Sequence, residues 1–137
     1  MPNLTRLRHE HDELLRIVRE LGRMIAERDP AELVQLFHVR QAFASLLVAH
    51  LKTEDWVLYP RLLASKDRHV AATARRFIDE LGGLADAYAR HSHDWTAFTI
   101  AADWPGYCRD TRRMIDALER RIERENEELY PLLEVAA

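Results

Sequence analysis

The chain has little of what organises secreted or membrane proteins. It has one cysteine, Cys108, so an intramolecular disulfide is impossible, which fits a reducing compartment. No run of about 18 apolar residues is present, which argues against a membrane span. The first residues lack the apolar core of a secretory signal. We therefore expect a cytoplasmic protein with no membrane partner.

An excess of charge of one sign is also lacking. There are 20 Lys and Arg residues against 23 Asp and Glu residues, which leaves a formal net charge of −3. No basic stripe is present, so nucleic acid is not expected as a partner. The length of 137 residues is sufficient for a hydrophobic core of its own. We expect one domain over residues 1–137.

Glycine (4 residues) and proline (5 residues) are scarce, and no useful length of sequence alternates apolar with polar residues. Helical periodicity runs through most of the chain instead. The first stripe consists of Leu4, Leu7, His11, Leu14, Val18, Leu21 and Ile25. The pattern predicts an all-α fold, an antiparallel up-and-down four-helix bundle. Its two helical hairpins are expected at about residues 4–63 and 68–135.

Polar residues interrupt the stripes that this bundle should bury. His50 and Glu54 are four residues apart, so they share one face of the second helix. His11 holds a position on the stripe of the first helix. Histidine and glutamate at buried positions need partners, which makes these three residues candidates for a site.

An internal repeat relates the two hairpins, at an offset of 71 residues for their second helices and of 70 for their first. Two segments correspond position by position: His50-LKT-Glu54-DWVL-Tyr59-Pro60 and Arg121-IER-Glu125-NEEL-Tyr130-Pro131. The other helices also correspond, with Glu10-His11 matching Glu80-Leu81. In the second hairpin, therefore, Arg121 replaces one histidine of the first and Leu81 replaces the other.

These motifs resemble the hemerythrin-like (HHE cation-binding) domain family over nearly the whole chain. The resemblance implies an up-and-down four-helix bundle that holds a non-haem iron centre, commonly of two irons. It also implies carriage, storage or sensing of oxygen, nitric oxide or iron. The family's ligand positions correspond to His11, His50, Glu54 and Glu125 in this sequence. Leu81 and Arg121 stand where the family has histidines, so the chain is a divergent member with an incomplete ligand set.

The six positions should share one layer, because the start of each odd helix lies beside the end of each even helix in such a bundle. Two imidazoles and two carboxylates suit iron(II), with manganese or zinc as alternatives. One ion is favoured over two, since two ions usually need more ligands. A metal would also compensate the charge of two buried carboxylates.

Arg121 could supply that charge without any metal. Its guanidinium stays protonated and can donate to carboxylates in pairs. In this alternative, Arg121 pairs with Glu54 and Glu125, and His11 and His50 complete a buried polar network. Both alternatives stay open on the sequence alone.

Other polar residues are candidates for supporting roles. Tyr59 and Tyr130 are expected to pack at helix ends, with hydrogen bonding to the site as a second possibility. Glu80 could reach the site if Gly82 and Gly83 rotate that turn inward. His91 lies ten residues beyond Leu81, about 15 Å along a helix. It therefore belongs to another layer, as a hydrogen-bonded core histidine.

Three functions compete. The first is a metal-binding sensor or regulator whose ligand is oxygen, nitric oxide or peroxide. The second is a metal-free helical module that regulates a protein partner. The third is an oxidase-like or peroxidase-like di-iron enzyme. It ranks last because such catalysis needs an open coordination position and usually two ions.

Overall fold

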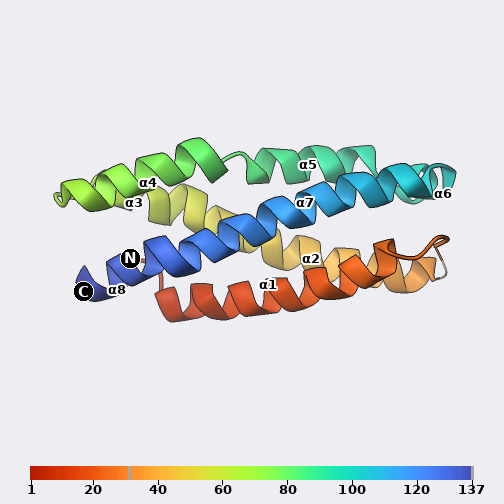
Figure 1. The fold of residues 1–137 in the computed structure, drawn as a ribbon, viewed down its shortest axis with the longest axis horizontal. Helices are drawn as coiled ribbons and strands as arrows, with labels where there is room; N and C mark the ends of the chain where they lie inside the picture. Colours follow the sequence, from red (N-terminus) through yellow and green to blue (C-terminus); the bar gives the residue numbers. More distant parts are fainter. Residues whose placement is uncertain (31, 137) are drawn as a thin grey trace.

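The computed structural model describes residues 1–30 and 32–136, which form four long helical rods and one short helix (Figure 1). The first rod is α1 (Leu4–Ile25). The second joins α2 (Leu33–Thr53), η1 (Glu54–Leu58) and α3 (Tyr59–Leu63), and the third joins α4 (Arg68–Leu81) and α5 (Leu84–Asp94). The short α6 (Ala97–Ala102) precedes the fourth rod, which joins α7 (Trp104–Arg124), η2 (Glu125–Leu129) and α8 (Tyr130–Ala136).

Successive rods run in opposite directions, so both chain ends and the turn between α3 and α4 lie at one end of the molecule, at the left of Figure 1. α1 packs against α2 and α7, α3 packs against α4, and α5 packs against α7. The predicted all-α antiparallel bundle is therefore confirmed. Within the described residues, no helix combines the length and the apolar character that crossing a membrane requires.

Side-chain caps fix the starts of three rods. Asn3 accepts a hydrogen bond from the backbone N–H of Arg6 at 3.1 Å, and this cap begins α1. Asp67 caps α4, and Asp103 accepts from the backbone N–H of Gly106 at the start of α7. Each cap satisfies a backbone donor that has no partner within its helix.

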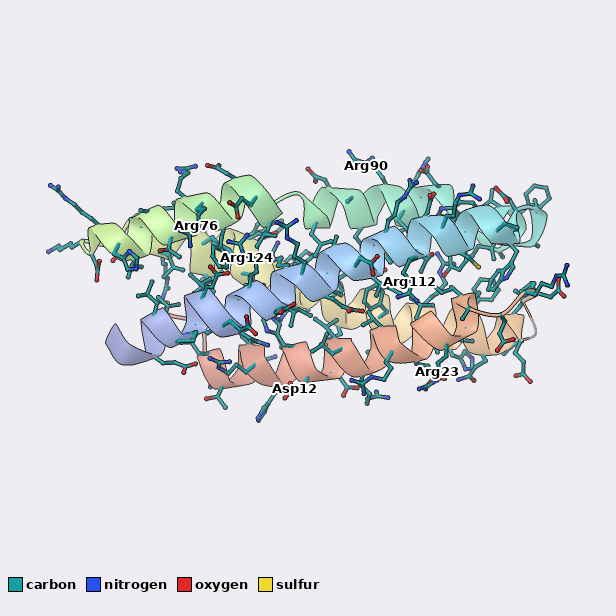
Figure 2. The ribbon with its side chains drawn as sticks, in the orientation of Figure 1. Asp12, Arg23, Arg76, Arg90, Arg112 and Arg124 are labelled. Atoms are coloured by element: carbon teal, nitrogen blue, oxygen red, sulfur yellow. The ribbon has the colours of Figure 1, made fainter. Side chains whose placement is uncertain are left out.

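The two adjacent glycines divide the third rod. α4 ends at Leu81 and α5 begins at Leu84, with Gly82 and Gly83 in a turn between them. A Cβ added at Gly82 would lie 2.4 Å from the carbonyl oxygen of Ile78, so this turn requires glycine. The break does not rotate Glu80 toward the bundle interior. Its carboxylate lies at the surface and pairs with Arg124, which Figure 2 shows pointing from α7 toward α4.

A polar layer divides the hydrophobic core into two clusters. The larger cluster contains Leu14, Leu47 and Ile115, and the smaller one contains Leu58 and Leu129, toward the end that holds the termini. Buried histidines and charged residues lie between these clusters in the first, second and fourth rods, and they are His11, His50, Glu54, Arg121 and Glu125. The polar residues that interrupt the apolar stripes of the helices therefore form one continuous layer.

His91 lies apart from this layer, partly buried beside Tyr107 of the larger core cluster. Its Nε2 atom shares a hydrogen bond of 2.9 Å with Oγ1 of Thr111, as expected for a core histidine. Burial lowers the pKa of His91 to about 4, and the nearby charge of Arg40 acts in the same direction. Asp110 and Asp94 oppose this shift but do not reverse it.

This lowered pKa predicts an acid-dependent loss of stability. Between pH 6.5 and 4 the unfolded chain binds a proton at His91 that the folded chain does not bind. Stability should therefore fall as pH decreases through that window. Allowing for partial exposure, the loss should be about 1–2 kcal/mol. His91→Gln should remove this part of the pH dependence in urea unfolding measured at several pH values.

His93→Gln is the matched control, because His93 lies on the same helix with its side chain 88% exposed. This variant should keep the acid dependence of the wild-type protein. An identical slope of stability against pH in His91→Gln and wild type would contradict the prediction.

Candidate metal centre

Five buried side chains form the candidate centre. His11 comes from α1, His50 from α2, Glu54 from the start of η1, Arg121 from α7 and Glu125 from the start of η2. Each is at most 2% exposed. Ionisable groups are seldom buried this completely unless they are paired or bind a ligand, so this layer is the strongest candidate for a functional site.

The internal repeat extends to the backbone. Glu54 and Glu125 each begin a π-helical turn, and the carbonyl of each accepts from the backbone N–H of the tyrosine five residues later. A π-turn accommodates one extra residue in a helix and changes the direction of the side chains around it. Such turns are frequent at functional sites. Both π-turns occur beside the buried layer, at equivalent points of the repeat.

The two histidines and two glutamates lie together in the bundle. Nε2 of His11 lies 3.1 Å from Oε1 of Glu125. Nε2 of His50 lies 3.0 Å from Oε1 of Glu54. One nitrogen or oxygen from each residue lies within 4.8 Å of the other three. These four atoms could converge on one ion.

Outer partners orient both imidazole rings. Nδ1 of His50 lies 2.8 Å from a carboxylate oxygen of Glu10. Nδ1 of His11 lies 2.7 Å from Oδ1 of Asn126. Since both partners are acceptors, each Nδ1 carries the proton of the neutral ring and each Nε2 presents its lone pair to the cluster. Metal-binding histidines are usually oriented in this way.

Two buried atoms of the cluster have no hydrogen-bond partner. They are Nε2 of His50 and Oε1 of Glu125. Each lies within ion-pair distance of its neighbour, but the atoms are not aligned for a hydrogen bond. In the neutral ring, the lone pair of His50 faces a carboxylate, which is unfavourable unless a proton or a metal ion lies between them, and unpaired buried polar atoms are costly. The arrangement therefore fits a divalent cation.

Arg121 makes both ion pairs that the metal-free hypothesis requires. Its Nη2 donates to Glu54 at 3.3 Å, and its Nε donates to Glu125 at 3.2 Å. The closest contact is from Nη2 to Asp55, at 2.7 Å. Nη1 donates to the backbone carbonyl of Leu81 at 3.4 Å, so the guanidinium reaches the end of α4.

The charges of this layer do not balance without one more cation. Glu54 and Glu125 are fully buried, and when both are ionised they carry two negative charges against the single charge of Arg121. Asp55, whose side chain is 24% exposed, also pairs with the guanidinium of Arg121. Either a proton on a histidine or a metal ion can supply the missing positive charge.

The pKa values of the metal-free cluster reflect this shortage of positive charge. Burial alone would lower the pKa of His50, but the carboxylate of Glu54, 3.0 Å from its Nε2, and that of Glu10 raise it to about 9. Burial would raise the pKa of Glu54, but His50 and Arg121 lower it to about 2. Burial and repulsion from Glu54 raise the pKa of Glu125. A proton on His50 therefore compensates Glu54 in the metal-free protein.

The two tyrosines of the repeat form crossed hydrogen bonds. Tyr59 donates to Oε2 of Glu125 at 2.6 Å. Tyr130 donates to Oε2 of Glu54. Each tyrosine thus holds the glutamate of the other hairpin, and burial raises the pKa of both phenols. The geometry places both tyrosines within hydrogen-bonding contact of the cluster as well as at the helix ends.

Three residues of the layer were not identified from the sequence. Glu10 and Asn126 orient the histidines, and Asp55 holds Arg121. The sequence did indicate two of these residues, because Asp55 and Asn126 directly follow the two glutamates of the repeat. The repeat also makes Glu10 the equivalent of Glu80. The residue that reaches the cluster is Glu10, whereas Glu80 lies at the surface.

Comparison with known proteins supports the same family. The model of the family described as hemerythrin HHE cation binding domain matches residues 3–133. Comparison with curated proteins and with solved structures gave no match. The family match covers nearly the whole chain, and the bundle brings the four ligand-position residues together in one buried layer. The chain therefore belongs to the hemerythrin HHE cation-binding domain family.

Proposed function

We propose that this protein binds one iron ion through His11, His50, Glu54 and Glu125, and that the occupied site serves a sensing or regulatory role. The observation that carries the proposal is the pair of buried atoms without partners, Nε2 of His50 and Oε1 of Glu125. Two nitrogen and two oxygen donors suit iron(II), and they also suit manganese or zinc. Bound iron would supply a binding position for oxygen, nitric oxide or peroxide.

A single ion is favoured over two by the position of Arg121. Its guanidinium pairs with both glutamates on the side where the family has further histidine ligands. A second ion there would have to displace a buried, permanently charged group. Arg121 and one metal ion together compensate Glu54, Glu125 and the nearby Asp55.

Asp55 offers a route from the buried cluster to the surface. It pairs with Arg121 on one side and lines a groove of about 520 Å³ between α2 and α5 on the other. Trp56, which is 71% exposed, and Val48 also line this groove. A change of charge at the cluster would alter the interaction of Arg121 with Asp55. A protein partner could detect that change without contacting the metal.

The metal-free regulatory module is the second candidate, and a specific observation favours it. Arg121 already contacts both glutamates, and a proton on His50 can supply the remaining charge. An oxidase-like or peroxidase-like enzyme has the least support, because Leu81 and Arg121 replace the ligands that a second ion would need.

Metal content distinguishes these functions. The untagged protein from iron-supplemented cells should contain about one metal ion per chain by inductively coupled plasma mass spectrometry. The double variant His11→Ala/His50→Ala should lose the metal, because half of the donor set and both oriented imidazoles are removed. Glu54 and Glu125 alone provide too few donors to hold the ion.

His9→Ala/His38→Ala is the matched control, since it removes two histidines that lie on the exposed surface of α1 and α2. This variant should retain the metal content of wild type. Circular dichroism should show that both double variants remain helical. Wild-type protein without metal would contradict the proposal and favour the metal-free module.

A further inference from the structure

The two tyrosines occupy equivalent positions of the repeat but have different neighbours. The hydroxyl of Tyr130 lies 3.3 Å from Nε2 of His11, and its ring stacks on that imidazole with centroids 5.2 Å apart. The ring of Tyr59 instead faces the guanidinium of Arg121 at 5.5 Å. Tyr130 therefore belongs to the histidine side of the cluster and Tyr59 to the arginine side.

The position of the Tyr130 hydroxyl matches that of a ligand atom. Nitrogen and oxygen donors bind transition metals at about 2.0–2.2 Å, so neighbouring donors on one ion are separated by roughly 2.8–3.6 Å. The separation between Tyr130 and His11 falls in this range, as do the two histidine–glutamate separations of 3.1 and 3.0 Å. Tyr130 is fully buried and also contacts Glu54, so its oxygen touches two of the four proposed ligands.

We propose that Tyr130 is a fifth ligand of the metal and binds as a phenolate when the ion is iron(III). This inference depends on the metal binding proposed above. On binding, the phenolic O–H bond breaks, the oxygen donates an electron pair to the ion, and the proton passes to bulk water. The hydrogen bond from the phenol to Glu54 is lost in that step, and the glutamate oxygen is free to bind the ion.

Charge explains why this ligand would suit iron(III). Glu54, Glu125, Asp55 and Arg121 together carry two net negative charges, which leaves a trivalent ion with one uncompensated positive charge. A phenolate removes that excess. Tyr130 would therefore favour the ferric over the ferrous state, whereas Tyr59 cannot do so because Arg121 occupies its side of the cluster.

Optical spectroscopy tests the proposal directly. Metal-free protein is loaded with iron(III) supplied as its citrate complex, and unbound iron is removed. A phenolate bound to iron(III) gives a visible charge-transfer band and tyrosinate vibrations in resonance Raman spectra. The wild-type protein should show both signals. Tyr130→Phe should lose both, and Tyr59→Phe, the matched control from the repeat, should retain both.

Iron content measured on the same samples separates the two proposals. Bound iron without the band in wild type, or a band that persists in Tyr130→Phe, would overturn the ligand role of Tyr130 and leave iron binding intact. Wild-type protein that takes up no iron would overturn both. If Tyr130→Phe does not fold, signals retained in Tyr59→Phe still identify Tyr130, because the remaining tyrosines, Tyr88 and Tyr107, belong to or pack on the other core cluster.

Discussion

Arg121→Met should destabilise the metal-free protein by about 3–5 kcal/mol, the range expected when one partner of a buried ion pair is removed. The reason is electrostatic, because methionine nearly preserves the apolar part of the side chain but leaves Glu54 and Glu125 without their shared cation. Asp55 would lose its closest partner as well. The free energy of unfolding should be measured by urea denaturation after treatment with a chelator.

Arg112→Met is the matched control for this substitution. Arg112 lies on the same helix, α7, but its side chain is 47% exposed and its ion pair with Asp116 is 3.9 Å long. Exposed pairs of this kind contribute little, so a change within about 0.5 kcal/mol is expected. Figure 2 shows Arg112 nearer than Arg124 to the start of α7.

Metal should partly rescue the Arg121→Met variant. An ion that binds only the folded state stabilises it by about 2.7 kcal/mol at a free concentration of 100 times Kd. Iron(II) or zinc added to the variant should therefore raise its unfolding midpoint. A loss of less than about 1 kcal/mol in the metal-free variant would show that Arg121 does not compensate the buried glutamates.

The fold was predictable because every rod carries a regular apolar stripe. The positions of His11, His50 and Glu54 on those stripes also predicted their burial, and an antiparallel bundle necessarily brings them to one level. The repeat then added Glu125 and identified Arg121 as the exceptional residue. Periodicity and chain direction therefore account for the composition of the layer.

The contacts within the layer were less predictable, for two physical reasons. The π-turns at Glu54 and Glu125 change the register of the helices, and propensity arguments do not reveal them. The partners of the imidazoles, Glu10 and Asn126, depend on side-chain directions between neighbouring rods. Helical periodicity places residues on a face, but it does not specify which atoms on that face meet.

The two hairpins contribute different groups to the layer, and this difference determines what the site can bind. The first hairpin supplies both histidines, and the second supplies the guanidinium. The crossed tyrosine–glutamate hydrogen bonds preserve the symmetry of the repeat around this difference. The layer can thus be understood as a two-cation site in which one cation, Arg121, is covalently part of the chain.

That interpretation predicts a gain of metal in Leu81→His/Arg121→His. Positions 81 and 121 are close together, since Nη1 of Arg121 donates to the backbone carbonyl of Leu81. The double substitution removes the built-in cation and adds two imidazoles beside Glu54 and Glu125. Metal content should rise from about one ion per chain to about two, because the new histidines and the second oxygens of the glutamates can hold a second ion.

Leu81→His alone is the critical control, because it adds a ligand while Arg121 still occupies the second position. It should keep the stoichiometry of wild type, and a second ion in this variant would show that Arg121 does not exclude one. A folded double variant that still binds one ion would mean that the missing histidines are not the only obstacle. Asp55 and the break at Gly82–Gly83, which fixes the end of α4 beside position 81, would then be the features that keep the second position closed.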